Sequence, residues 1–276
     1  MKLNPKTKAL LALAGMALMT SAAQAANVTA PRTNYNADNG TNGDLILVIA
    51  GNNTGGTPVD LEFDLGLAST TFTNASSVVN LSTTVLASTI ASTFGAGWFS
   101  DTTLTWGVVG TVNSTLSGNA IIWATSPTTT ARTSAPLQNN TTGQLQLSEN
   151  NIHGIYSNLN NDPNVNGAAP HGAAVVLQTN AASYTLEEGS SNNAFGLGTI
   201  DGQLAGTGAQ VLDLYQLSGA AGSGNGLLLG TFSITNSGNT VSFTPVPEPS
   251  TYAMVGLGAI AILFLARRKS QLNLVS

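Results

Sequence analysis

The sequence contains no cysteine, so disulfide bonds and thiolate metal sites are excluded. It is also poor in positive charge: six of its eight Lys and Arg residues lie near the two ends, and only Arg32 and Arg132 lie between them. The central residues 26–245 hold twelve of the thirteen Asp and Glu residues. A region with this excess of negative charge repels nucleic acid, so we expect no nucleic-acid partner.

This central region is instead rich in Thr, Ser, Asn and Gly residues. This composition favours β-structure with frequent turns. Without disulfides, a folded region of this size depends on core burial alone, or on burial together with a hard cation such as calcium.

The first 25 residues have the pattern of a signal peptide. An apolar run at 9–19 is too short to span a bilayer and follows three basic residues, Lys2, Lys6 and Lys8. Small residues at Ala23 and Ala25 have the spacing of a signal-peptidase site. We therefore predict cleavage after Ala25 by signal peptidase, which leaves Ala26 as the new N-terminus.

The C-terminal tail has three successive parts. An extended proline segment comes first and consists of Val246, Pro247, Glu248, Pro249 and Ser250. An uncharged apolar run at 251–266 follows, and as a helix it spans about 24 Å, which is short of a ~30 Å hydrocarbon core. Arg267, Arg268 and Lys269 then form a basic cluster that should stay on the cytoplasmic side. An ordinary C-terminal membrane anchor is the alternative interpretation.

This order of motif, apolar helix and basic cluster resembles the PEP-CTERM sorting signal of exported Gram-negative proteins. The resemblance implies export, transient anchoring in the inner membrane by a single transmembrane helix over 251–266, and recognition of the tail 246–269 by an exosortase. That membrane-embedded cysteine peptidase or transpeptidase would act near the Pro-Glu-Pro segment, and its nucleophile belongs to the partner. Shorter stretches, such as 95–98, 106–110 and 213–217, resemble uncharacterised PEP-CTERM proteins of exopolysaccharide-forming bacteria.

Hydrophobic periodicity predicts a mainly β domain at 26–245. Residues 44–50 are continuously apolar after Asp44, and residues 59–65 alternate between apolar and acidic side chains, so we expect the two to form a hairpin. Residues 80–94 change to a four-residue period that ends at Gly95 and predicts one short helix. Further strands are predicted at 102–112, 120–125, 144–147, 173–178, 183–187, 211–217, 227–235 and 240–244. The fold expected is an antiparallel β-sandwich, with a connection or domain seam at 126–172.

Asp60, Glu62 and Asp64 form the densest group of acids and lie on one face of the predicted strand 59–65. Carboxylates are the ligands that calcium prefers, so these three residues are a candidate cation site. The alternative is a solvated face that keeps an outer strand soluble.

Trp98, Trp106 and Trp123 are candidates for stacking on sugars, and the alternative is that they fill the core. His153 and His171 are the only histidines, and no nucleophile motif accompanies them. Glu187, Glu188 and Asp201 are candidates for a glycosidase pair. Adjacent glutamates on a strand point to opposite faces, however, which argues against that pair.

We therefore expect a non-enzymatic exported protein of the cell surface or extracellular matrix, associated with exopolysaccharide. The alternatives are a carbohydrate-binding module and a hydrolase of matrix glycans.

Overall fold

The computed structural model describes residues 26–28, 43–68, 72, 79–82, 84–112, 121–127, 138–139, 142–161, 173–190, 197, 200–204, 210–218, 224–235 and 240–246. The predicted signal peptide and the tail beyond residue 246 lie outside the described residues.

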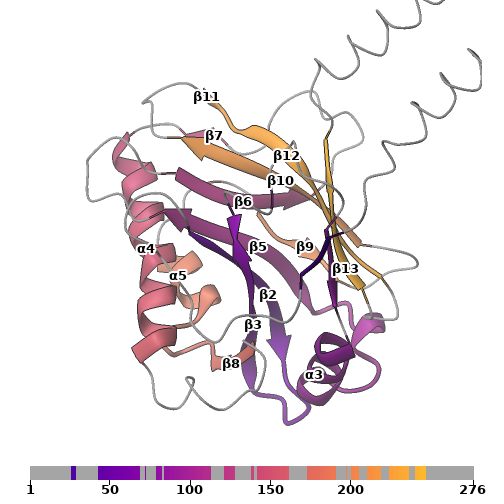
Figure 1. Ribbon diagram of the computed structural model, residues 1–276. Helices are drawn as coiled ribbons and strands as arrows, with labels where there is room; N and C mark the ends of the chain where they lie inside the picture. Colours follow the sequence, from indigo (N-terminus) through magenta and orange to yellow (C-terminus); the bar gives the residue numbers. More distant parts are fainter. Residues whose placement is uncertain are drawn as a thin grey trace, which may run out of the picture.

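One large sheet organises this region (Figure 1). It has eleven strands, of which ten follow the order β1-β4-β13-β12-β10-β6-β5-β2-β3-β8, while β9 pairs with β5. Every pairing is antiparallel except β1 with β4. The strands are β1 (Ala26–Val28), β2 (Asp44–Asn52), β3 (Pro58–Leu67), β4 (Val79–Ser82), β5 (Thr105–Val112), β6 (Ile121–Pro127), β8 (Ala173–Leu177), β9 (Gly202–Gln203), β10 (Gln210–Ser218), β12 (Leu227–Ile234) and β13 (Thr240–Pro245). A second, two-stranded sheet joins β7 (Gln138–Asn139) to β11 (Gly224–Asn225).

The predicted hairpin is confirmed as the pair β2 and β3, with Leu47 opposite Phe63. Its turn is held by Asn53, whose side-chain oxygen accepts hydrogen bonds from the backbone N–H groups of Gly55 and Thr57 at 2.9 and 3.0 Å. This is the local bonding that makes Asn a favoured turn residue. The predicted strands that became β5, β6, β8, β10, β12 and β13 are confirmed as well.

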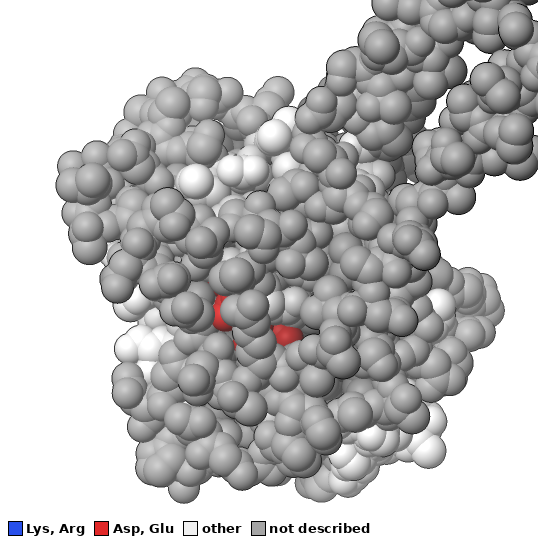
Figure 2. Space-filling view, in the orientation of Figure 1, with Lys and Arg blue, Asp and Glu red and all other residues white. Residues whose placement is uncertain are grey.

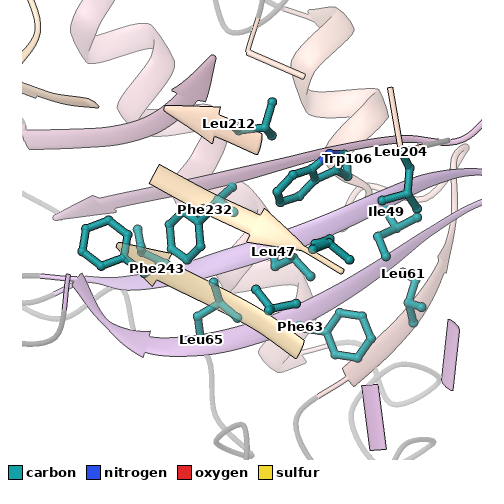
Figure 3. Close-up of a cluster of buried hydrophobic side chains, with 14 of the residues drawn as sticks. Leu47, Ile49, Leu61, Phe63, Leu65, Trp106, Leu204, Leu212, Phe232 and Phe243 are labelled. Atoms are coloured by element: carbon teal, nitrogen blue, oxygen red, sulfur yellow. The ribbon is translucent and has the colours of Figure 1, made fainter. Parts of the chain in front are cut away.

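The sheet is curled, so that its two ends pack against each other. In Figure 3, Phe232 of β12 and Phe243 of β13 lie over Leu47 and Leu65 of β2 and β3. Phe72 joins the two phenylalanines, with ring centroids 5.2 to 5.4 Å apart. The prediction of a mainly antiparallel β fold is therefore confirmed. The layers come from one continuous sheet, however, whereas a sandwich has two.

Within the described residues three α-helices accompany the sheet, where the sequence predicted one short helix for the domain. The predicted helix is confirmed as α3 (Thr84–Phe94), which ends at Gly95 with a positive φ of 92°. Strand β4 takes the residues just before it, which were predicted as part of the helix. A short 3-10 helix, Trp98–Ser100, follows.

The other two helices lie side by side on the face opposite the aromatic cluster (Figure 1). They are α4 (Thr142–Asn161) and α5 (Tyr184–Ser190). The strands predicted at 144–147 and 183–187 are therefore wrong. Short apolar runs are ambiguous between helix and strand, and the Asn, Ser and Gly residues of α4 are poor helix formers that conceal its period.

Candidate functional site

The acids of β3 lie inside the protein, between the sheet and the helical layer. Asp60, Glu62 and Asp64 are 0%, 0% and 1% exposed. Val59 and Leu61, which alternate with them, face the aromatic cluster on the other side. The interpretation of these acids as a solvated face is wrong, because β3 is covered on both faces. In the view of Figure 2, the acidic side chains that are visible among the described residues form small areas near the centre.

Asp60 is the most heavily bonded of the three. Its two oxygens accept hydrogen bonds from the Ser183 hydroxyl at 2.6 Å, from the backbone N–H and hydroxyl of Thr185 at 2.8 and 2.7 Å, and from the Gln178 amide at 3.0 Å. Ser183 lies just before α5 and accepts a further bond from the N–H of Leu186. Asp60 thus fixes the cap of α5 to the sheet.

Glu62 also attaches the N-terminus of α5 to β3. Its Oε1 accepts the backbone N–H of Tyr184 at 2.9 Å, so the first two amides of α5 donate to two neighbouring carboxyl groups of β3. Helix N-termini carry unpaired N–H groups and partial positive charge, which explains why acids are stable there. Burial, and next the charge of Asp60, raise the pKa of Glu62 well above its usual range.

Two further acids, Glu188 and Asp201, belong to the same region. Tyr184 donates its phenolic hydrogen to Asp201 Oδ1 at 2.5 Å, and Glu188 stands on the same short helix. Gly107 of β5 leaves the space for this contact, because a Cβ there would overlap Asp201 Oδ1 and approach the Tyr184 hydroxyl. The carboxyl group of Asp201 therefore lies directly against the sheet backbone.

The surroundings of Glu188 and Asp201 raise their pKa values by different amounts. Burial, followed by the charges of Asp201 and Asp60, raises the pKa of Glu188 to about 8. Burial also raises the pKa of Asp201 to about 6, despite the opposing hydrogen bond from Tyr184. Both pKa values are raised, that of Glu188 more than that of Asp201, and unequal proton affinities of two carboxyl groups are what acid–base chemistry requires.

The sequence argument against this pair depended on the wrong secondary structure. On a strand, Glu187 and Glu188 would point to opposite faces, whereas α5 turns both toward the helical layer and the sheet. The signal was present, because Ser183 is a good N-cap and Glu187 lies in the first helical turn. His153 lies on α4, and His171 lies outside the described residues.

No metal centre was found among the described residues: no group of three or more His, Asp or Glu side chains there has an arrangement that could hold an ion. Calcium binding by Asp60, Glu62 and Asp64 stays a prediction.

The three tryptophans belong to the core. Trp98, Trp106 and Trp123 are 5%, 1% and 2% exposed, so none presents an open face to a sugar. Trp98 packs edge-on against Phe99, with ring centroids 5.2 Å apart. Sugar stacking on exposed tryptophans is therefore wrong, and the core interpretation is confirmed.

The last strand leads straight into the proline segment. β13 is an interior strand, paired with β12 on one side and with β4 on the other. The N–H of Val246 still donates to the carbonyl of Leu229 at 3.0 Å, one residue before Pro247. β4 also pairs with β1, which begins at Ala26, the first residue after the predicted signal-peptidase site. The folded region is thus bounded by the two predicted processing segments.

Residues 245–269 match a family model described as the PEP-CTERM protein-sorting motif. The chain carries a PEP-CTERM sorting signal. The match covers the extended segment, the apolar run and the basic cluster, so the resemblance drawn from the sequence is confirmed. A PEP-CTERM signal marks a secreted protein that is transiently anchored in the membrane and then processed by an exosortase. No curated protein and no solved structure matches the chain. Among the helices of the described part, none is long and apolar enough to cross a membrane.

Proposed function

We propose that the PEP-CTERM protein is a non-enzymatic component of the cell surface or extracellular matrix, and that its β domain works within exopolysaccharide. The observation that supports this most directly is the junction at Val246, where an interior strand meets the sorting motif without a linker. Cleavage after the junction would release the complete sheet. Removal of the signal peptide after Ala25 would likewise leave β1 whole.

The charge of the described region is compatible with a polysaccharide matrix. Of the residues that the structure describes, none is Lys or Arg, so a hydrated polar matrix is a better partner than an anionic polymer such as nucleic acid. The buried tryptophans remove the usual stacking platform, so we expect weak or distributed contact with polysaccharide rather than a dedicated sugar site.

We expect the processed protein to co-elute with high-molecular-weight exopolysaccharide when the matrix of its native host is separated by size. Enzymatic digestion of the polysaccharide should shift the protein to the elution volume of a single domain. Elution at the single-domain position before digestion would contradict matrix association, and digestion of an unrelated polymer, such as DNA, serves as the control.

A glycan hydrolase is the second candidate, because Glu188 and Asp201 form a pair with unequal proton affinities. The test is release of reducing ends from the same polysaccharide by the purified protein and by Glu188→Gln and Asp201→Asn variants. We expect no release from any of them. Release that disappears in both variants but persists in Glu187→Gln would overturn the non-enzymatic proposal.

A further inference from the structure

Strand β8 lies at one end of the large sheet (Figure 1). It pairs with β3 on one side, and the described residues place no strand along its other side. The strand contains neither proline nor a charged residue, and these are the features that usually prevent another strand from pairing with a sheet edge. The open side of β8 can therefore accept a further strand through backbone hydrogen bonds.

The register shows which backbone groups of β8 face this open side. The N–H of Gln178 donates to the carbonyl of Pro58 at 3.2 Å, just beyond the end of the pairing between β8 and β3. Bonded pairs alternate along antiparallel strands, so Ala174 and Val176 also direct their N–H and C=O groups toward β3. The groups that point outward are those of Ala173, Val175 and Leu177.

Two of these outward-bonding residues also carry exposed apolar side chains. Val175 and Leu177 are 47% and 52% exposed, although Leu61, which lies opposite Val175 on β3, is completely buried in the aromatic cluster. Val176, which alternates with them, is buried against the helical layer. A strand paired at this edge would therefore bond the outward backbone groups and cover both side chains at the same time.

The distribution of charge favours a second copy of the chain as the partner. Residues 163–186 contain no Asp, Glu, Lys or Arg, so all twelve acids of the region 26–245 lie outside this stretch. Asp60 and Glu62 of the adjacent β3 point to the opposite face, where they accept the amides of α5. Two copies of an acidic chain can therefore meet along β8 without bringing like charges together.

We propose that the domain forms a two-fold symmetric dimer in which the β8 strands of two copies pair antiparallel, with Val175 opposite Val175. The outward residues are placed symmetrically about this position, so Ala173 lies opposite Leu177 of the second copy. The Leu177 carbonyl accepts the N–H of Asn180 at 2.8 Å and has a second lone pair for the new bond. The paired strand is short, so the dimer should dissociate on dilution.

Sedimentation equilibrium of the processed protein, without polysaccharide, tests this over a wide range of concentration. We expect the mass to rise from that of one chain to that of two and no further, because the dimer uses the open edge of both copies. Val175→Lys places two like charges on the symmetry axis and should keep the protein monomeric. The matched control is Leu227→Lys, which changes an exposed apolar residue of β12 and should dimerise like the wild type.

A chemical cross-link locates the contact. The chain has no cysteine, so Val175→Cys introduces a single thiol, which a short bis-maleimide should join into a covalent dimer. Leu227→Cys should give several-fold less covalent dimer at the same concentration. Val175→Pro removes only an outward N–H, which an edge strand tolerates, and should also abolish dimerisation.

A single-chain mass at every concentration, in a wild type that circular dichroism shows to be folded, would overturn the proposal. Dimerisation of Val175→Lys like the wild type, or equal cross-linking of the two cysteine variants, would do so as well. A mass that keeps growing with concentration would indicate head-to-tail pairing with another edge, such as β1, and would contradict the two-fold arrangement. If Val175→Lys or Val175→Pro does not fold, the two cysteine variants decide.

Discussion

Replacing Pro247, Glu248 and Pro249 together by alanine is expected to abolish processing of the tail in the native host. The two prolines favour an extended segment and remove two backbone N–H groups, while Glu248 supplies its only charge. Alanines in their place would favour extension of the helix predicted for 251–266 toward the folded domain. Intact mass and C-terminal peptide mapping should show a shortened wild-type protein and a variant that keeps residues 247–276.

A matched control is Thr244→Ala, which changes an exposed residue of β13 just before the motif and should be processed like the wild type. A wild-type protein that keeps its full C-terminus in the membranes of a host with the exosortase would contradict the sorting assignment. Equal processing of the triple alanine variant would show that the exosortase reads another part of the tail.

Regular alternation made most of the sheet predictable. Val59 and Leu61 alternate with acids, and whichever face the acids take, the period of two requires a strand. The run at 44–50 was equally clear, because an apolar segment bounded by glycines suits a strand buried on both faces. The closure of one sheet upon itself was not predictable, since it packs Phe232 and Phe243 over Leu47 and Leu65, which are far from them in the sequence.

Helix α4 was missed for a compositional reason. Its buried residues recur at three- and four-residue intervals, as a helix requires, and are Leu145, Ser148, Glu149, Ile152, Ile155, Tyr156 and Leu159. The surrounding Asn and Gly residues, and the prolines spread over 126–172, favoured a loop. A period analysis that ignored propensity would have found this helix.

The burial of the β3 acids could not be predicted from their own neighbourhood. Asp60 receives its hydrogen bonds from residues near α5, and Ser183 lies 123 positions along the chain. Burial of a carboxylate normally costs free energy, so a strand with alternating acids is predicted to be solvent-exposed. The prediction changes only when hydrogen-bond donors from distant parts of the sequence are known. The pairing of Glu188 with Asp201 was not predicted for the same reason, because it depends on the packing of α5 on the sheet.

Asp60→Ala is expected to be the most destabilising single substitution among the residues that attach the helical layer to the sheet, lowering the free energy of unfolding by roughly 3–5 kcal/mol. The alanine would leave the N–H and hydroxyl of Thr185, the Ser183 hydroxyl and the Gln178 amide without their buried acceptor. Asp60→Asn should recover only part of the loss, because an amide nitrogen replaces one of the two acceptor oxygens. Urea denaturation, followed by circular dichroism, measures both values.

Asp101→Ala is the matched control. Asp101 also accepts a backbone N–H and a hydroxyl from one threonine, Thr103, at 2.9 and 2.7 Å, but it does so at the surface. Water can replace a lost acceptor there, so the destabilisation should be several-fold smaller than for Asp60→Ala. Similar losses for the two alanine variants would show that the threonine bonds alone set the cost, and that burial of Asp60 beneath α5 adds nothing to the stability of the domain.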